Sequence, residues 1–500
     1  MHPRYEDKNI KRIFSDEFKL DLWQKLELAV LQARVNLKRI PKETYNEIAD
    51  RLNTNPIDLD WWRNRDKEIG HDLNAFLDER LRFLPHHLHQ YFHEGLTSYD
   101  TEESPFVLNL EESLNKVSDK YEPVKNALIA LAKKYRYTIM MARTHGQEAE
   151  LQSFGKRALT WLGDAEIAYE QAMMAATILN FSKLAGAIGN YGSLDPELEE
   201  ETLRILDLKP YYGATQIMPR VLYAPIAQGL CNLSLVMQKI SLDIRLSARS
   251  GRPLMREPFG RKQKGSSAMP HKKNPISLEQ VEGQIRLIKA YSNAITENIV
   301  TWEERAIEQS CVERVAWPDL FHAVIRILTV MEKTLNGLTV YPDHMLDEVV
   351  DSRGTYAAGE AKEFLKKHLT ASDLGHEDVY RIVQLASFNA FFPSVRRLMI
   401  RDNIPESYDE AFKNLEAISK LNDEPRTSIK DIIRRGELRF SSELDIPETE
   451  VRRYNACLKE FFDSIAPDHS QRLEVWEKVF NPAERLKYED ILFQKTLKKL

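Results

Sequence analysis

Apolar residues recur every three or four positions over long stretches of the chain, which is the spacing of an amphipathic helix. Pro123 lies inside the first of these stretches, so we expect a kink or a break in that helix near residue 122. No stretch of any length alternates between apolar and polar residues as a half-buried strand does. The pattern therefore predicts an all-α protein built on a bundle of long helices. The stretches that show it are 114–135, 158–179, 226–244, 278–288 and roughly 318–336.

We expect the chain to fold as three helical domains. The first boundary follows the polar segment TSYDTEESP, which we expect to be a turn, and the second falls near DSRGTYAAGEA. The predicted N-terminal helical domain is 1–105, the central long-helix bundle is 106–362, and the C-terminal helical domain is 363–500. The stretch 226–244 is apolar beyond one face, which favours a central helix of a larger bundle that subunits share.

Composition excludes several classes of protein. The 500 residues are 43% hydrophobic and 29% charged, which supplies a sizeable core and argues against disorder. The net charge of −6 gives no basic excess for nucleic acid. There is no uncharged apolar run of about 18 residues for a membrane span, and the first residues lack the apolar region of a signal peptide. Three distant cysteines show neither zinc spacing nor a disulfide framework, so we expect a cytoplasmic protein.

The segment GSSAMPHKKNP, residues 265–275, is the first of four that do not read as ordinary helix surface. Two prolines and a glycine exclude a helix interior, and basic residues precede the segment. A long basic loop rich in Gly and Ser is typical of a mobile lid over an anion, although an ordinary surface connection has the same composition.

The other three segments carry histidine, arginine and hydroxyl side chains. In ARTHGQEAELQSFGKR, His145 precedes a long helix, where a helix cap or a core histidine is the alternative to a functional role. In GHDLNAFLDE and HEGLTSYD, His71 and His93 are compatible with plain surface residues. In ERAIEQSCVER, Ser310 and Arg314 share a helical face, whereas Arg305 does not unless a turn intervenes. A solvated charged helix is the alternative for this last segment.

Together these segments resemble the adenylosuccinate lyases, a family of the fumarase/aspartase superfamily. GSSAMPHKKNP is similar to the superfamily's signature loop at eleven positions, including both prolines and the Lys-x-Asn pair. ARTHGQEAE, HEGLTSYD and ERAIEQSCVER resemble adenylosuccinate lyases more than fumarases, aspartases or argininosuccinate lyases. The resemblance covers about residues 1–400 in order and is weak over 400–500, where the chain is longer than a typical member.

The resemblance implies a fold and an activity. The fold has three mostly helical domains, and a homotetramer is built on a central helical bundle, with each active site assembled from three subunits. The substrate is a small nucleotide: fumarate leaves adenylosuccinate by β-elimination to give AMP, and it leaves the succinyl-carboxamide ribonucleotide of purine synthesis (SAICAR to AICAR) in the same way. The family requires no metal or organic cofactor.

The resemblance also assigns chemical roles. Ser266 matches the general base, with Ser267 beside it as an open alternative, and His145 matches the general acid. A serine is a poor base at neutral pH, so its oxyanion needs backbone N–H groups and a cation, for which Lys272 is suited. The catalytic set is His145, Ser266, His71, Lys272 and Glu279, where His71 orients His145 or the substrate and Glu279 holds loop or histidine geometry.

The implied substrate-binding residues supply hydroxyl, amide and guanidinium groups for carboxylates and a phosphate. Arg305, Ser310 and Arg314 match the family's phosphate-binding set, and Arg4 and Tyr5 match its N-terminal contribution. The full set is Arg4, Tyr5, His93, Thr97, Ser98, Thr144, Gln216, Ser267, Asn274, Arg305, Ser310 and Arg314.

One departure and two alternatives accompany the resemblance. Where the family often has AEPTTFG, this chain has AELQSFG at 149–155, which leaves carboxylate recognition at that segment less defined. A sister lyase, such as argininosuccinate lyase or the carboxymuconate cycloisomerase, is the nearest alternative, but those substrates lack a phosphate. A catalytically silent relative kept as a structural tetramer is the other, and the intact His145, Ser266 and Lys272 argue against it.

Overall fold

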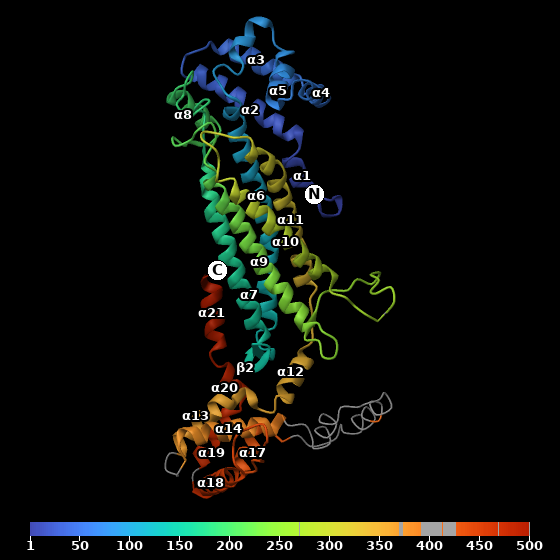
Figure 1. Ribbon diagram of the computed structural model, residues 1–500, viewed down its shortest axis with the longest axis vertical. Helices are drawn as coiled ribbons and strands as arrows, with labels where there is room; N and C mark the ends of the chain where they lie inside the picture. Colours follow the sequence, from blue (N-terminus) through green and yellow to red (C-terminus); the bar gives the residue numbers. More distant parts are fainter. Residues whose placement is uncertain (270, 370–373, 392–412, 414–426, 469, 500) are drawn as a thin grey trace. The chain divides into compact units, whose positions relative to one another are not determined.

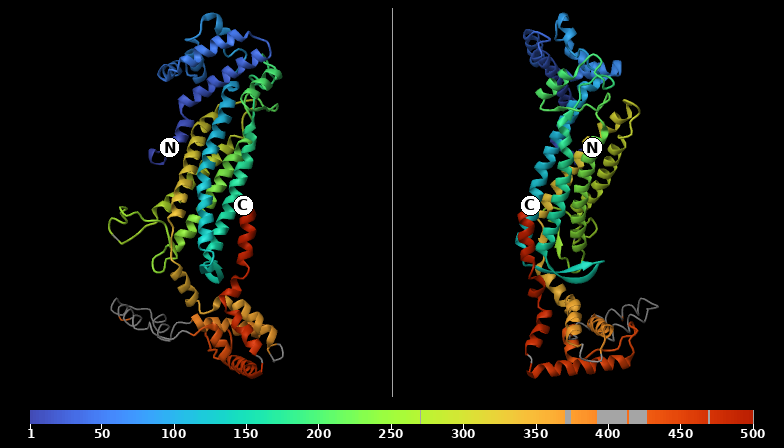
Figure 2. Two further views of the ribbon diagram at one scale, coloured as in Figure 1. Left: turned by 180° about the vertical axis from the view of Figure 1, so that it is seen from behind. Right: turned by 90° about the vertical axis from the view of Figure 1, so that its left-hand side faces the viewer.

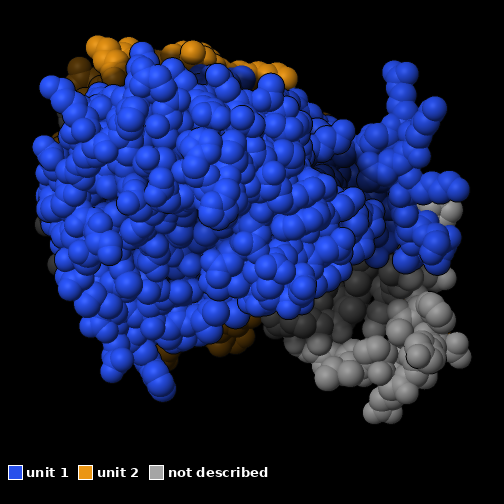
Figure 3. Space-filling view, turned by 90° about the horizontal axis from the view of Figure 1, so that it is seen from above, with its two compact units in different colours: residues 1–130, 160–249, 255–339 blue, residues 131–159, 250–254, 340–500 orange. Residues whose placement is uncertain are grey.

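The computed structural model of the chain (Figure 1) describes residues 1–269, 271–369, 374–391, 413, 427–468 and 470–499. Pro270 of the signature segment lies outside the described residues, as do 392–412 and 414–426 of the expected C-terminal domain. The chain divides into two compact units, which Figure 3 colours separately. Unit 1 is Met1–Ala130, Thr160–Arg249 and Met255–Thr339, and unit 2 is Leu131–Leu159, Ser250–Leu254 and Val340–Leu500. The division into three domains stays a prediction.

Long helices form the body of unit 1 and run side by side in all three ribbon views (Figures 1 and 2). Their apolar stripes are the ones that the sequence predicts, and α10 packs against both α9 and α11. Helices account for most of the described residues, so the all-α prediction is confirmed. None of the helices in the described parts of the chain combines the length and the hydropathy needed to cross a membrane. The long helices are α6 (Ser98–Lys134), α7 (Phe154–Ala176), α9 (Ala224–Ser247), α10 (Ile276–Glu297) and α11 (Glu308–Asn336).

Two outcomes at helix boundaries concern α6. The helix continues through Pro123, so the break that the sequence offered as an alternative to a kink does not occur. Tyr121 and Val124 on either side are buried, so packing outweighs the cost of about 3 kcal/mol that an interior proline carries. The segment TSYDTEESP is also not a turn, because α6 begins at Ser98.

Shorter elements complete unit 1. Trp23, Phe76 and Phe92 lie in one apolar cluster that holds the N-terminal helices together. β3 pairs in parallel with β4, with Phe181 opposite Lys209. The elements are η1 (Pro3–Tyr5), α1 (Lys8–Ile13), α2 (Asp16–Asn36), α3 (Lys42–Thr54), α4 (Leu59–Ile69), α5 (Asp72–Leu81), η2 (His86–Tyr91), η3 (Thr177–Asn180), β3 (Phe181–Ser182), α8 (Pro196–Ile205), β4 (Lys209–Pro210), η4 (Arg220–Leu222) and β5 (Met255–Arg256), with β6 (Thr339–Val340) at the boundary.

Unit 2 contains a β-hairpin and a set of short helices. The hairpin strands β1 (Ile139–Thr144) and β2 (Gln147–Ser153) contradict the expectation that no strand pattern of any length is present. Phe364, Tyr454 and Trp476 anchor the apolar core between the helices. The helices are α12 (Pro342–Asp351), η5 (Thr355–Ala357), α13 (Ala358–His368), α14 (His376–Phe391), α17 (Ile429–Arg435), α18 (Glu448–Asp468), α19 (Ser470–Val479), α20 (Pro482–Leu486) and α21 (Glu489–Lys499).

Candidate active site

His145 lies at the tip of the hairpin in unit 2. Thr144 is paired with Gln147, which leaves His145 and Gly146 as a two-residue turn. Their φ angles are 53° and 77°, so both residues occupy the left-handed region that a type I′ turn requires. His145 and Thr144 are exposed and no helix begins at this point, so the core and helix-cap interpretations of His145 are wrong.

A charged contact within unit 2 fixes the end of this hairpin. Arg143, next to Thr144, donates two hydrogen bonds to the Glu348 carboxylate of α12, with Nη1–Oε2 and Nη2–Oε1 distances of 3.0 and 2.8 Å. Such a two-point guanidinium–carboxylate contact sets orientation as well as distance. The turn therefore presents the imidazole of His145 to solvent from an anchored strand.

In unit 1, α11 meets the start of α5 beside His71. His71 is the N-cap of α5, and its ring Nδ1 accepts the Asn74 N–H at 3.3 Å. The next residue, Asp72, accepts a hydrogen bond from Nη2 of Arg314 at 2.9 Å. This contact brings an arginine of the predicted phosphate-binding set to within one residue of the second predicted histidine.

A cavity of about 480 Å³ opens at this point in unit 1, within the size range of pockets that hold small ligands. Its walls combine indole and phenyl rings with charged groups of both signs. Residues from α2, α4, α5, α6 and α11 contribute, among them Trp23, Trp62, Asp72, Glu102, Ser310 and Arg314. Two of the three predicted phosphate-binding residues, Ser310 and Arg314, therefore line this cavity.

Glu102 gives the cavity a group that titrates near neutrality. Burial raises the pKa of its carboxyl to about 7, the negative charge of Asp72 adds to the rise, and the positive charge of Arg314 opposes it. A carboxyl with a raised pKa inside a cavity is a mark of functional sites. Motif reasoning missed Glu102 because this property depends on neighbours from three different helices.

Arg305 and Gln216 meet at the side of the cavity. Nη1 of Arg305 donates to Oε1 of Gln216 at 2.8 Å, and the guanidinium lies 4.1 Å from the centroid of the Tyr99 ring, which lines the cavity. α11 begins only at Glu308, so Arg305 lies outside the helix that carries Ser310 and Arg314. Its guanidinium reaches the cavity at Tyr99.

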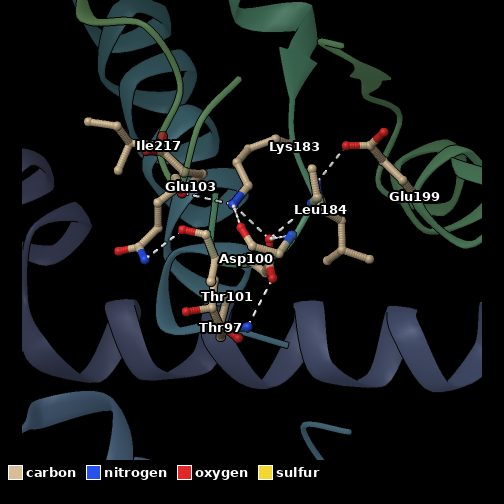
Figure 4. Close-up of polar contacts among 12 residues, drawn as sticks. Thr97, Asp100, Thr101, Glu103, Lys183, Leu184, Glu199 and Ile217 are labelled. Carbon is tan, nitrogen blue, oxygen red and sulfur yellow. Dashed lines mark hydrogen bonds and ion pairs between the residues drawn. The ribbon is translucent and has the colours of Figure 1, made fainter. Parts of the chain in front are cut away.

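The segment with His93, Thr97 and Ser98 enters α6 through a set of buried side chains (Figure 4). His93 has a φ of 58°, and its Nδ1 lies 2.7 Å from Oε1 of the buried Glu27. The Thr97 N–H donates to Oδ2 of Asp100 at 2.9 Å, and Ser98 is the first residue of α6. The start of α6 is therefore fixed by acidic groups to which the sequence assigned no role.

The signature loop connects β5 to α10 in unit 1, and Figure 1 shows it projecting away from the helices. The Ser266 Oγ accepts hydrogen bonds from the N–H groups of Ala268 and Met269 at 3.3 and 3.1 Å. A Cβ on Gly265 would lie 2.3 Å from the Lys272 carbonyl oxygen, so glycine is required where the two arms of the loop approach. The loop thereby places Ser266 and Lys272 in neighbouring arms.

A buried carboxylate fixes the end of this loop. Glu257, which precedes the loop, accepts the N–H groups of Ser277 and Leu278 at 3.2 and 3.0 Å and so caps α10. The N-cap residue itself, Pro275, makes no capping hydrogen bond with its side chain. Glu279, in the first turn of α10, is exposed and lies 3.8 Å from Nη2 of Arg245.

The N-terminal residues run along α11. The Met1 amino group contacts Asp319 at 2.8 Å and the Asp7 N–H donates to Nδ1 of His322 at 2.9 Å. Arg4 and Tyr5 lie between these two attachments, in η1. Arg4 is exposed and Tyr5 is half-buried, which leaves both side chains accessible to a ligand.

Most of the predicted site residues fall into three groups, and those outside them are Arg4, Tyr5, His93, Thr97, Ser98 and Glu279. The cavity group in unit 1 contains Ser310 and Arg314, with His71, Arg305 and Gln216 at its edge. The loop group in unit 1 contains the two serines, Lys272 and Asn274, and among the described residues no hydrogen bond or ion pair joins the loop serines to the cavity. The hairpin group, Thr144 and His145, belongs to unit 2.

Comparisons with known proteins identify the family. A family model described as "Lyase" matches residues 7–288. Adenylosuccinate lyase from Synechocystis sp. is 32% identical over 394 residues, which cover 78% of this chain and 89% of that protein. Adenylosuccinate lyase from Thermotoga maritima is 30% identical over 82% of this chain and 96% of that protein.

Solved structures show the same fold at lower identity. A fumarate lyase from Mesorhizobium sp. BNC1 superposes with a TM-score of 0.70 at 22% identity, over 96% of this chain and 99% of that one. A β-carboxy-cis,cis-muconate cycloisomerase from Acinetobacter calcoaceticus gives a TM-score of 0.71 at 18% identity, over 99% and 98%. The family model and the two relatives at 30% identity or more show that the chain belongs to the adenylosuccinate lyase family and that the protein is an enzyme of the lyase class.

Proposed function

We propose that the protein releases fumarate from adenylosuccinate, leaving AMP, and from SAICAR, leaving AICAR. The observation that carries the proposal is the cavity of unit 1, which Ser310 and Arg314 line. There Arg314 binds Asp72, the residue that follows His71. Adenylosuccinate is the substrate that the names of the relatives indicate. The reaction breaks a C–N bond.

The cavity suits the nucleotide phosphate. The Arg314 side chain is 63% exposed and uses one nitrogen for Asp72, so its other donors are free to bind a phosphate. The Ser310 hydroxyl donates to the Ile307 carbonyl at 2.8 Å and can turn the same hydrogen to a phosphate oxygen. A substrate without a phosphate would make no use of the remaining Arg314 donors, which favours a nucleotide over argininosuccinate.

The elimination needs a base and an acid on opposite sides of the bond that breaks. The base removes a proton from the carbon next to a carboxylate, and the electron pair is held as an aci-carboxylate. This pair then forms the double bond of fumarate while the C–N bond breaks, and the acid delivers a proton to the departing nitrogen. Stabilisation of the aci-carboxylate by hydrogen-bond donors and cations is the largest contribution expected from the protein.

Ser266 is the proposed base. The two backbone N–H groups that donate to its Oγ would stabilise the negatively charged oxygen that a serine base needs. Ser267 is exposed, and no comparable pair of backbone donors reaches its hydroxyl among the described residues. This contrast supports Ser266 over Ser267, and Lys272 on the adjacent arm would supply the cation.

His145 is the proposed acid, because histidine is the side chain that most often transfers protons in enzymes. Its exposed place at the tip of an anchored hairpin supports this role, since the acid must reach a substrate held by other segments. His71 would orient the substrate or His145 from the start of α5. Thr144 and Thr97, with Ser98, would supply contacts to carboxylates.

We also propose a homotetramer in which neighbouring subunits complete each site. Large apolar side chains remain exposed on the long helices of unit 1, which supports a partner surface there. They are Ile167, Met174, Leu242, Leu246 and Leu287. The cytoplasmic location stays a prediction.

Measurement of fumarate release tests the proposed function. Purified protein would be offered adenylosuccinate, SAICAR and argininosuccinate in parallel, without added metal. We expect release from the first two only. Release from argininosuccinate alone would keep the elimination but contradict the phosphate assignment, and release from none would contradict the proposal in favour of another sister lyase or a silent scaffold.

A further inference from the structure

A fully buried ion pair lies beneath two of the proposed substrate contacts in unit 1. Asp100, in the first turn of α6, and Lys183, directly after β3, are both 0% exposed, and Oδ1 lies 2.7 Å from Nζ. Figure 4 shows the two side chains pointing toward each other. Asp100 is the last residue of the segment HEGLTSYD, but the family resemblance assigns no role to either member of the pair.

The Asp100 carboxylate binds two separate segments. Its Oδ2 accepts the Thr97 N–H at 2.9 Å, and its Oδ1 accepts the N–H groups of Ala185 and Gly186 at 3.0 and 3.2 Å. These bonds hold the residue that precedes α6 against the loop that follows β3. The position of Thr97 therefore depends directly on this carboxylate.

The Lys183 ammonium binds the segment that carries Gln216. Besides Asp100, its Nζ donates to the carbonyl of Gly186 at 3.2 Å and to that of Gln216 at 2.8 Å. An ammonium has three donors, and all three have acceptors here. With its main chain fixed in this way, Gln216 directs its side chain to Nη1 of Arg305 and to the Ala187 carbonyl.

The pair is also costly as a purely structural element. Two buried charges are often no better for stability than apolar side chains of the same size. A second acidic residue one turn further along α6, Glu103, fixes the Met218 N–H at 3.1 Å, so the 214–218 segment is attached at both of these points. One ion pair joins the Thr97 and Gln216 segments. A need for both residues to face the same ligand would explain this arrangement.

We propose that the Asp100–Lys183 ion pair positions the substrate-binding surface, by fixing Thr97 and the main chain of Gln216 relative to each other. Asp100 and Lys183 are positioning residues, since both side chains are fully buried. The inference rests on the proposed function for the identity of the ligand, but the order of the two segments can be measured without any ligand.

The test is the double variant Asp100→Asn, Lys183→Met, which removes both charges together and avoids leaving one buried charge unpaired. The matched control is Lys125→Met, Glu166→Gln, which removes the ion pair between α6 and α7 (Nζ–Oε2 2.6 Å) away from the site. We expect the KM for adenylosuccinate to rise at least about tenfold in the first variant, with kcat changed less than about threefold, because uniform binding is lost. The control should keep the KM of the wild type.

Amide hydrogen exchange supplies the second measurement. Peptides that cover 94–98 and 214–217 should exchange faster in the double variant than in the control, at similar melting temperatures. A wild-type KM in the folded double variant, or unchanged exchange in both peptides, would overturn the inference. If the wild type releases no fumarate, the proposed function fails while the exchange comparison still decides the positioning role.

Should the double variant fail to fold, Asp100→Glu takes its place, because it keeps both charges and only moves the carboxylate by one methylene. The same rise in KM and the same faster exchange are expected. In the wild type itself, the two peptides should open together as one cooperative unit. Independent opening of 214–217 would contradict the inference without any variant.

Discussion

Asp72 holds Arg314 in the same cavity into which Glu102 places its carboxyl. At the scale of single residues, neighbouring charges and burial decide the chemistry, since nothing in the sequence distinguishes Glu102 from other acidic residues. Its pKa is raised to about 7, first by desolvation and then by the negative charge of Asp72. Near neutral pH, Glu102 therefore changes between a proton donor and an anion that competes with a phosphate for Arg314.

Glu102 should make the stability of the protein fall with rising pH. In the unfolded chain the pKa of Glu102 is about 4.5, so between about pH 4.5 and 7 the folded state binds more protons than the unfolded state. The stability that Glu102 contributes is therefore fully present below about pH 4.5 and is lost as the pH rises through 7. Each pKa unit is worth about 1.4 kcal/mol, so the full effect is about 3.5 kcal/mol, of which about 2 kcal/mol falls between pH 5.5 and 8. Glu102→Gln should remove it. Urea denaturation at pH 5.5 and 8 checks this, and an equal pH dependence in both proteins would refute it.

At the scale of elements, the hairpin explains why His145 is exposed and why the sequence did not predict strands. The register of β1 against β2 shifts between Met141 and Arg143, and Met140 and Met141 are both buried. This irregularity removes the alternation by which a strand is recognised. The dipeptide His145-Gly146 is a usable turn signal, but it is weaker than Asn-Gly or Asp-Gly.

His145→Asn should separate catalysis from hairpin stability. Asparagine tolerates a positive φ, so we expect little change in melting temperature, whereas loss of the acid should lower kcat by about 10²–10⁴-fold. Gly146→Ala is the matched variant. A Cβ there meets no atom within 4 Å, so its expected loss of about 1 kcal/mol reports backbone strain alone. Full activity of His145→Asn would contradict the assignment of the acid.

The cap of α10 by Glu257 is a second property of elements. Glu257→Ala should lower the free energy of unfolding by about 1–2 kcal/mol, because two N–H groups at the start of α10 lose their acceptor. Glu297→Ala, at the exposed last turn of the same helix, should change it by less than about 0.5 kcal/mol. Denaturant titration of both variants measures the difference, and equal losses would argue against the cap.

At the scale of the whole molecule, the candidate residues divide between two units. His145 belongs to unit 2, whereas Ser266 and the cavity belong to unit 1. A homotetramer can supply these groups from different subunits, and the exposed apolar side chains of the long helices give it a surface.

Mixing two inactive variants tests this arrangement. If His145 and Ser266 of one site come from different subunits, mixed tetramers of His145→Asn and Ser266→Ala subunits contain some sites with both groups intact. Random mixing then restores about a quarter of the sites. Fumarate release after joint refolding measures the recovery. Sedimentation should show a tetramer, and mixed tetramers without activity would contradict the shared site.

The sequence predicted most of the fold of unit 1, because regular apolar stripes specify long helices directly. It did not predict that α6 continues through Pro123 or begins at Ser98, since tertiary packing overrides both local signals. Motifs singled out the residues proposed to face a ligand, such as Arg314 and Ser266. Asp100, Lys183 and Glu102 were missed because their roles arise from contacts between segments far apart in the chain.

The identity of the base is the most direct point to test. Fumarate release from adenylosuccinate would be followed for Ser266→Ala and, as a matched neighbour, Ser267→Ala. We expect kcat to fall at least about 10³-fold for Ser266→Ala and less than about tenfold for Ser267→Ala, with both proteins folded. Near-normal turnover by Ser266→Ala would contradict the assignment of the signature-loop serine as the base.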